Sequence, residues 1–429
     1  MQKNINSIIK DIVNLFNDFE ELVPKKYIDA VKTAYLELKN TECEVMICST
    51  MSSGKSTLIN AMLGTKLLPC NQETCSAILT RIKDTDEFPF KAAVYDKDDK
   101  LLRTSKNLTL KEMEDWNADE KVSEIQIYGN FPFMDEELMS LVLIETPSPN
   151  NTRHASRRAV QQSLLNKSSK ALVLYIMTGT YGTDDDNALL GRVAESMKVG
   201  GKQSKDRFMF VLNKLDCRIE EDGDLNVTLN SLRKYLKNHG IDNPNIFPAG
   251  ALPAMNIRLQ AQGQLSKVEQ MKTNMQIVTL NCADYLHLEK YATLPPSLQQ
   301  EIDDRLQTAQ QNWQDDADLN PETALIHTGI PSIEMAIREY FRENDDFAEK
   351  IKNFVDVCSF SLQTCYNYCE IKYNTEITNA KEDILSDDDF CDNKKNLEGL
   401  VNNLEKIISE KYTITAVLDK IAYNLQMLN

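Results

Sequence analysis

Apolar residues at the start of the chain recur every three or four positions, which is the spacing of a helix with one buried face. Such residues stand before and after Pro24, and we predict two helices within residues 1–40. Because an apolar stripe must be covered, these helices need packing partners from elsewhere in the chain. The stripe residues are Ile5, Ile8, Ile9, Ile12, Phe16 and Phe19, followed by Tyr27, Val31, Tyr35 and Leu38.

From residue 43 onward the pattern changes to short apolar runs separated by helical or loop segments. Strands that alternate with helices are typical of a mainly parallel sheet. We therefore predict an α/β domain over residues 41–343 that closes with a helix at Ser332–Phe341. The predicted strands are Val45–Cys48, Phe90–Tyr95, Ile125–Tyr128, Leu141–Ile144, Ala171–Met177, Phe208–Leu212 and Ile246–Phe247.

Two further segments have helical patterns. Residues 255–327 are rich in Gln and Leu and interrupt the alternation, which indicates a helical insertion in the α/β domain. Residues 344–429 carry two apolar stripes around the acidic residues 386–389, which predicts a C-terminal helical bundle segment with a loop between its parts. The stripes are Ile351, Phe354, Val355, Cys358, Leu362, Cys365 and Cys369, then Leu397, Leu400, Val401, Leu404, Ile407, Ile408, Val417, Leu418, Ile421 and Leu425.

The chain is strongly acidic, with 65 Asp and Glu against 48 Lys and Arg and a net charge of −17. Such a surface repels phosphate backbones, so we expect no nucleic-acid partner. The N-terminus does not resemble a signal peptide, and no apolar stretch approaches the roughly 20 residues of a membrane span. These features predict a cytoplasmic protein.

The ten cysteines follow no repeating framework and several lie in apolar patterns. Free thiols in a reducing compartment are therefore expected rather than disulfides. A zinc site is not expected either, because Cys365 and Cys369 could share a helix face but lie far in sequence from every histidine.

A phosphate-binding loop is predicted between the first strand and the helix that starts near Thr57. Backbone N–H groups of such a loop surround phosphates, and the helix dipole favours their charge. Lys55 would reach the β- and γ-phosphates, and the Ser56 hydroxyl would coordinate Mg²⁺. Ser49 stands where the usual pattern has its first glycine. The predicted nucleotide-binding residues here are Thr50, Met51, Ser53, Gly54, Lys55, Ser56 and Thr57.

A second motif, Asn213-Lys214-Leu215-Asp216, follows the strand Phe208–Leu212. The Asp216 carboxylate can accept from the N1–H and the 2-amino group of guanine, and adenine has no such pair of donors. Asn213 would steady the loop, and Lys214 would lie along the base. The motif therefore predicts GTP and GDP as ligands rather than adenine nucleotides.

A third motif ends the strand Leu141–Ile144, where GTPases with a phosphate-binding loop carry Asp-x-x-Gly. Here Glu145 replaces the Asp that holds a Mg²⁺-bound water, and Ser148 replaces the Gly whose amide contacts the γ-phosphate. Glutamate is longer by one methylene, and serine lacks the conformational freedom of glycine. We expect nucleotide binding to survive both changes and hydrolysis to be slow.

Taken together, these motifs resemble those of bacterial dynamin-like GTPases. The resemblance covers residues of roughly 43–250, about half of the chain. It implies a dynamin-type GTPase domain flanked by an α-helical neck or stalk bundle that residues 1–40 and 344–429 would build. The matching segments are Met51–Gly64, Leu67–Pro69, Cys75–Ala77, Glu145–Asn151 and Asn213–Asp216.

The resemblance also implies roles for single residues. Ser76 stands where the family has its switch-I threonine, which binds Mg²⁺ and positions the attacking water, and Thr74 is the alternative. Ser52 matches a serine that helps to stabilise the transition state, whereas Met51 replaces the usual glutamine. Gly250 and Ala251 match the loop that backs the guanine base. The predicted catalytic residues are Ser52, Lys55 and Ser76, and the predicted Mg²⁺ ligands are Ser56, Ser76 and Glu145.

The family resemblance implies slow Mg²⁺-dependent GTP hydrolysis, coupled through pairing of GTPase domains to movement of the helical bundle. The expected partner is a second copy in a dimer or larger oligomer, or a second dynamin-like protein. Lipid contact, peripheral at the inner membrane face, stays open for so acidic a chain. A hydrolysis-impaired GTP-binding scaffold that regulates a partner is the alternative, favoured by the departures at Ser49, Glu145 and Ser148.

Overall fold

The computed structural model has two compact units, residues 1–41, 136–139 and 342–429 in one, and residues 42–135 and 140–341 in the other. Each unit is considered by itself. Of the 429 residues, the structure describes 9, 12–14, 16–17, 24–39, 42–49, 52–70, 78–85, 87–134, 140–146, 171–197, 207–342 and 345–386.

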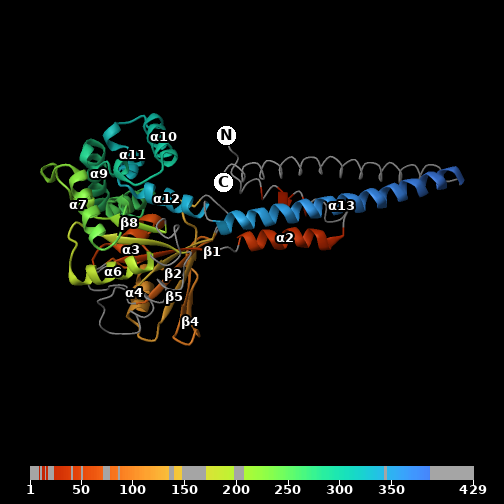
Figure 1. Cartoon of the computed structure of the whole chain (residues 1–429), viewed down its shortest axis with the longest axis horizontal. Helices are drawn as coiled ribbons and strands as arrows, with labels where there is room; N and C mark the ends of the chain where they lie inside the picture. Colours follow the sequence, from red (N-terminus) through yellow and green to blue (C-terminus); the bar gives the residue numbers. More distant parts are fainter. Residues whose placement is uncertain are drawn as a thin grey trace. The chain divides into compact units, whose positions relative to one another are not determined.

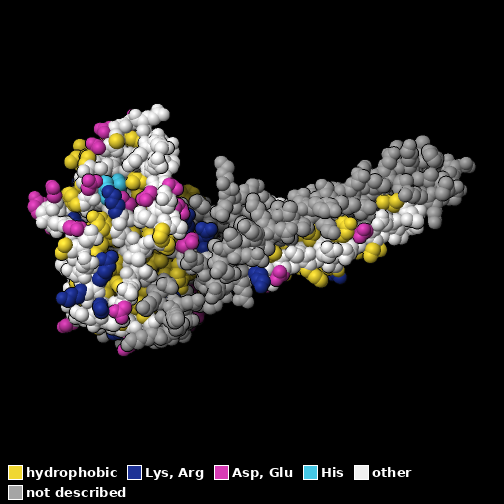
Figure 2. All heavy atoms as spheres, turned by 45° about the horizontal axis from the view of Figure 1, so that its top comes forward, with side chains coloured by type: hydrophobic (Ala, Val, Ile, Leu, Met, Phe, Trp, Pro, Cys, Tyr) yellow, Lys and Arg dark blue, Asp and Glu magenta, His cyan; other side chains and the backbone are white. Residues whose placement is uncertain are grey.

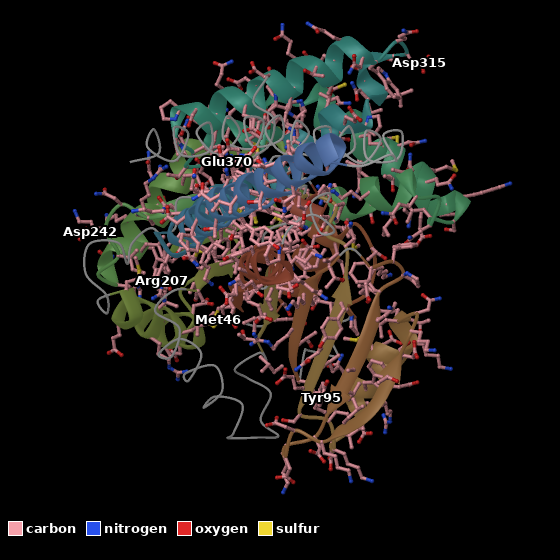
Figure 3. All side chains as sticks on the ribbon, turned by 90° about the vertical axis from the view of Figure 1, so that its right-hand side faces the viewer. Met46, Tyr95, Arg207, Asp242, Asp315 and Glu370 are labelled. Carbon is pink, nitrogen blue, oxygen red and sulfur yellow. The ribbon has the colours of Figure 1, made fainter. Side chains whose placement is uncertain are left out.

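The larger unit is built on a nine-stranded sheet (Figure 1) with the strand order β4-β3-β5-β2-β6-β1-β7-β8-β9. In Figure 3, Met46 marks β1 near the centre of the sheet and Tyr95 marks β3 towards one edge. The strands are β1 (Glu42–Ser49), β2 (Leu79–Asp84), β3 (Lys91–Tyr95), β4 (Leu101–Ser105), β5 (Glu124–Gly129), β6 (Ser140–Glu145), β7 (Leu172–Met177), β8 (Phe208–Leu212) and β9 (Asn245–Pro248).

The half of the sheet formed by β6, β1, β7, β8 and β9 is entirely parallel. Every residue of β6, β7 and β8 is buried, as expected where helices cover both faces of parallel strands. Continuous apolar runs therefore identified these strands correctly in the sequence. Because the strands are parallel, their carboxyl ends at Ser49, Glu145, Met177, Leu212 and Pro248 share one edge, and the predicted site loops all leave from it.

The other half of the sheet is mixed. Strand β2 is antiparallel to β6 and parallel to β5, and β3 is antiparallel to both β5 and β4. Sequence reasoning found β3 and β5 but missed β2 and β4. Strand β2 is only half-buried and pairs its basic side chains with β1, through Lys83 Nζ and Glu42 Oε1 at 2.8 Å. Strand β4 lies at the edge and has no buried residue, so neither strand carries an apolar run.

Helices surround the sheet, and the core between β7, β8 and two of them is apolar throughout. The first of these helices spans Asp184–Met197 and contributes Leu189 and Val193. The second spans Leu225–Asn238 and contributes Leu229 and Leu232, and all four side chains pack with Phe210 of β8. Connecting helices outside the insertion are α3 (Lys55–Leu63), α4 (Leu110–Ala118), α6 (Asp184–Met197), α7 (Leu225–Asn238) and α12 (Ile330–Arg342), with short 3-10 turns η2 (Leu215–Cys217) and η3 (Glu220–Asp222).

Residues between β9 and α12 are mostly helical, and α9, α10 and α11 gather into one cluster (Figure 1). The helices begin at Ala251, four residues before the predicted start, because the chain passes from β9 into a helix through Ala249 and Gly250 alone. The elements are α8 (Ala251–Ala261), α9 (Lys267–Cys282), η4 (Asp284–Leu286), η5 (Leu288–Tyr291), α10 (Pro296–Asn312), η6 (Ala317–Leu319) and α11 (Pro321–His327).

The smaller unit pairs helix α2 (Lys25–Lys39) with the long helix α13 (Asp345–Ser386). Most described residues of their predicted stripes are buried, including Val31 and Leu38 of α2 and Phe354 and Cys358 of α13, whereas Tyr27 and Tyr35 are half-buried. The bounds of the first predicted helix, the side chain of Cys369 and the whole stripe from Leu397 to Leu425 lie outside the described residues. Among the described cysteines, those at 43, 48, 70, 217, 282, 358 and 365 are not joined in disulfides.

A buried ion pair fastens the end of α3 to the surrounding helices. Arg258 of α8 donates through Nη1 to the Ala61 carbonyl oxygen at 2.6 Å, which lies in the last turn of α3. The same guanidinium contacts both carboxylate oxygens of Glu334 in α12, at 2.6 and 2.8 Å. The two side chains are 15% and 5% exposed, so neither charge has ready access to water.

This arrangement predicts that Glu334→Ala lowers the free energy of unfolding by about 3–5 kcal/mol, because it leaves the Arg258 charge buried and unpaired. The matched control is Glu301→Ala, which removes the partner of Arg338 from a pair whose carboxylate side chain is 47% exposed. That change should cost less than about 1 kcal/mol. Urea unfolding followed by circular dichroism measures both values, and equal effects would contradict the assignment.

Candidate nucleotide site

The phosphate-binding loop connects the end of β1 to the start of α3, and residues 52–54 of it are described. Ser52 and Gly54 both have left-handed backbone conformations, with φ of 63° and 92°. A Cβ on Gly54 would lie 2.5 Å from Asn213 Nδ2, so only glycine fits there. Lys55 opens α3 and is 6% exposed, and Ser53 is buried beside it. The N-terminus of α3 and its lysine therefore face the loop as phosphate binding requires.

Asn213 joins the loops that leave the carboxyl edge of the sheet. Its Nδ2 donates to the Ser53 carbonyl oxygen at 2.9 Å, and its Oδ1 accepts from the Ala251 N–H at 3.1 Å. Its own N–H donates to the Met177 carbonyl oxygen at 2.8 Å. One side chain, 2% exposed, thus ties the phosphate loop to the predicted guanine loop at the start of α8. The structure brings these sequence-predicted residues together.

Asp216 lies in the short turn η2 that follows Lys214, whose φ of 67° is left-handed. Gly250 packs directly against it, since a Cβ on Gly250 would lie 3.1 Å from Asp216 Cβ. Burial raises the pKa of the Asp216 carboxyl. This acid is therefore held with little water around it, where a pair of guanine N–H donors would be worth most.

At the predicted Mg²⁺ position, Ser56 Oγ donates directly to Glu145 Oε1 at 2.6 Å. Ser56 begins α3 and Glu145 ends β6, and the carboxylate is 2% exposed. Hydroxyl and carboxylate oxygens are the hard donors that Mg²⁺ takes, so the two residues fit this ion. The longer glutamate side chain reaches the Ser56 hydroxyl directly, and the hydroxyl oxygen keeps its lone pairs for an ion.

Two polar residues support the site although sequence reasoning gave them no role. Asn60, fully buried in α3, accepts from the N–H groups of Leu67 and Leu68 at 3.1 and 2.9 Å and donates to the Leu68 carbonyl oxygen at 2.8 Å. It shapes the turn before Pro69, and its presence in the resemblance segment was the available signal. Thr146 follows Glu145 and bonds through Oγ1 to the Ile47 carbonyl oxygen at 2.9 Å. Its presence in the resemblance segment Glu145–Asn151 was likewise the available signal.

Four predicted site residues lie outside the described residues: Thr50, Met51, Ser76 and Ser148, together with the alternative Thr74. Their roles stay predictions. The described members of the set converge at the carboxyl edge of the parallel half-sheet. A phosphate loop after β1 and a guanine-type loop after β8, joined by Asn213, define the class of P-loop GTPases.

Comparison with known proteins finds one family model and one similar protein. Residues 45–215 match the model of the dynamin family. A protein of Caldicellulosiruptor sp. (strain Rt8B.4), described as an uncharacterized protein in the xynA 3′ region, is 24% identical over 296 residues, which cover 68% of this chain and 67% of that protein. The family model matches the part of the chain in which the sequence motifs resemble those of dynamin-like GTPases.

Solved structures that resemble this chain align to it with TM-scores below 0.5. Two are described as an oligomerised bacterial dynamin pair that provides a mechanism for long-range sensing and tethering of membranes. Their TM-scores are 0.45 and 0.42 at 15% and 17% identity, over 97% and 100% of this chain and 69% and 79% of theirs. Era in complex with MgGDPNP and 16S ribosomal RNA has a TM-score of 0.29 at 18% identity, over 52% of this chain and 55% of that one.

The raised pKa of Asp216 leads to a prediction about pH. Guanine binding needs the ionised carboxylate, so affinity for GDP should fall as pH drops through a pKa above the ordinary value of 3.8. Asp216→Asn removes the acceptor and should weaken GDP binding at least about 100-fold at neutral pH, because buried guanine donors would be left unpaired. Titration with a fluorescent GDP analogue at a series of pH values measures both effects.

The control for this prediction is Asp222→Asn in the neighbouring turn η3, which changes the same functional group on an exposed residue. It should bind GDP like the unchanged protein. Equal GDP and ADP affinity in the unchanged protein would contradict the guanine assignment of Asp216.

Proposed function

We propose that this protein binds GTP and GDP with Mg²⁺ and hydrolyses GTP slowly, as a dynamin-like GTPase. The observation that carries the proposal is the Asn213 side chain, which joins the phosphate loop to the guanine loop while Asp216 stands half-buried beside them. The match of residues 45–215 to the dynamin family model supports guanine-nucleotide binding and gives GTP hydrolysis as the expected reaction.

Lys55 would bind the β- and γ-phosphates, and the N–H groups at the start of α3 would bind the phosphate oxygens. Ser56 and Glu145, with Ser76 from the sequence, would hold Mg²⁺, which neutralises charge on the phosphates when bound. Ser52 would stabilise charge in the transition state from its left-handed position in the loop. Asn213 and Asp216 orient the base, so that the γ-phosphate is placed by the same loops that recognise guanine.

We expect slow turnover because Glu145 is one methylene longer than the aspartate usual at this position. Its carboxylate accepts directly from the Ser56 hydroxyl at 2.6 Å and could hold a Mg²⁺-bound water only after a shift. The same contact favours the second candidate function, a GTP-binding scaffold with impaired hydrolysis that pairs with or regulates another protein. In both cases the nucleotide is bound, and the two differ only in turnover.

We further propose that GTPase domains pair, as a homodimer or with a second dynamin-like protein, and that helices such as α2 and α13 respond to this pairing. Their buried apolar stripe and length suit a helical bundle that transmits movement. Among the helices described, none has the length and apolar composition to cross a membrane. On the face shown in Figure 2, Lys and Arg side chains are scattered among Asp and Glu, so peripheral lipid contact would need another feature.

Mg²⁺-dependent GTP hydrolysis should rise per molecule with protein concentration, because catalysis by paired domains depends on encounter. A phosphate-release assay at low and high concentration measures this rate, with Lys55→Ala as the inactive control. Turnover no greater than that control, with GTP still bound by the unchanged protein, would reject the slow GTPase and leave the scaffold. Sedimentation with liposomes, with and without GTP, separately tests lipid contact.

Glu145→Asp should raise turnover at least about tenfold, equivalent to about 1.4 kcal/mol of barrier. The shorter acid would leave room between its carboxylate and the ion for the Mg²⁺-bound water that an aspartate at this position holds. Glu44→Asp is the matched control, since Glu44 lies on β1 and pairs with Arg81 away from the loops. Equal rates for both variants would show that the Ser56–Glu145 contact does not limit hydrolysis.

A further inference from the structure

Away from the nucleotide site, two histidines and a glutamate form a buried cluster. His287 stands between the turns η4 and η5, Glu289 lies in η5, and His327 ends α11. They are 8%, 1% and 3% exposed. One donor atom from each lies within 4.8 Å of the others. Residues almost 40 positions apart in sequence are thus brought together only by the fold of the insertion.

The cluster leaves strongly polar atoms without partners. Glu289 Oε1 contacts His327 Nδ1 at 3.0 Å, but Glu289 Oε2 and His287 Nε2 are buried with no hydrogen-bond partner in the structure. Almost all buried polar atoms in proteins are paired with protein or bound groups, and each exception calls for an explanation. A fully buried carboxylate with a single partner is the most demanding case.

Protonation of the two histidines would not give Glu289 Oε2 a hydrogen-bond partner. A protonated His327 would pair with Oε1 and still leave Oε2 without a donor. The imidazole rings of His287 and His327 stack with centroids 3.6 Å apart and planes 5° apart, so two charged rings would repel each other. Lys290 Nζ is directed to His287 Nδ1, at 3.0 Å, rather than to the carboxylate. The missing component is a cation that can contact Oε2 and a ring nitrogen together.

We propose that His287, Glu289 and His327 bind one divalent transition-metal ion of the zinc type. Two imidazoles and a carboxylate are a donor set that Zn²⁺ and related ions take, and hard ions such as Mg²⁺ prefer oxygen alone. Asp284 Oδ1 lies 3.5 Å from His287 Nδ1 and can accept its proton once Nε2 binds the ion. The site lies on segments that sequence reasoning, which considered only cysteine pairs, did not connect.

Binding requires one imidazole to turn. The lone pair of each ring nitrogen lies in the ring plane, so two parallel stacked rings cannot both direct a lone pair at one ion. Lys290 Nζ donates to Nδ1 of His287 in the stacked arrangement, which places the ring proton on Nε2. Loading the ion therefore breaks the stack and moves the ring proton from Nε2 to Nδ1, where Asp284 can accept a hydrogen bond from it. Binding then satisfies both unpaired atoms at once.

The location gives the ion a structural role. It would join the segment 284–291 to the end of α11, two parts of the insertion that otherwise contact through side chains. The residue after His327 is Thr328, whose carbonyl oxygen accepts from the Gly250 N–H at 2.9 Å. Gly250 in turn packs against Asp216. The ion would thus brace the backbone on which the predicted guanine loop rests.

The test uses the purified full chain, stripped with a chelator and titrated with Co²⁺ and Zn²⁺. Co²⁺ should give the visible ligand-field spectrum of a low-coordinate site at one ion per chain, and Zn²⁺ should displace it and raise the midpoint of thermal unfolding. Glu289→Gln and His327→Gln should weaken binding at least about tenfold, since even outer-shell changes at metal sites cost that much. His239→Gln is the control, because His239 contacts the Tyr235 carbonyl oxygen away from the cluster.

A measurement on the unchanged protein keeps the proposal testable if a variant does not fold. X-ray absorption at the zinc edge should show nitrogen and oxygen ligands at ~2.0 Å with imidazole scattering, and no sulfur at ~2.3 Å. Sulfur ligation would assign the zinc to the cysteines and overturn the proposal. Failure of the unchanged protein to bind either ion stoichiometrically, or equal binding by folded Glu289→Gln, would overturn it as well.

Discussion

The amide side chain of Asn213 is the contact on which the nucleotide site depends. Parallel strands place their carboxyl ends at one edge, but loops that leave a common edge still need a fixed spacing. The amide donates to the phosphate loop at Ser53 and accepts from the start of α8 at Ala251, so it sets that spacing with two neutral hydrogen bonds in a buried position. Gly54 is required because the amide lies where any side chain would be.

The surrounding helices pack against both of the loops that the Asn213 side chain joins. Arg258 binds the last turn of α3 and the Glu334 carboxylate, and Thr328 holds Gly250 through a backbone hydrogen bond. The insertion therefore packs against both the phosphate helix and the guanine loop. Its polar cluster of His287, Glu289 and His327 lies next to the second of these supports, because His327 directly precedes Thr328 in the chain.

Glu145 stands where the motif usually has aspartate, and this difference alters the position of the carboxylate but not the fold around it. Glu145 occupies the end of β6 in the register of the sheet, opposite Ile47 of β1, as a GTPase of this class requires. Its carboxylate accepts a 2.6 Å hydrogen bond from the Ser56 hydroxyl, whose oxygen keeps its lone pairs for a metal ion. The strand register is thus kept while the longer acid contacts Ser56 directly.

The sequence by itself determined the parallel strands, the amphipathic helices and the two loop motifs, because continuous apolar runs, helical periodicity and Gly-Lys-Ser or Asn-Lys-x-Asp spacing are local properties. It could not reveal β2 and β4, whose half-buried or exposed residues are stabilised by neighbouring strands rather than by an apolar run. Only the tertiary structure decided that Asn213 spans two loops, that Glu145 contacts Ser56, and that His287 and Glu289 meet His327. Each of these contacts joins residues at least 38 positions apart, and no local pattern records such a distance.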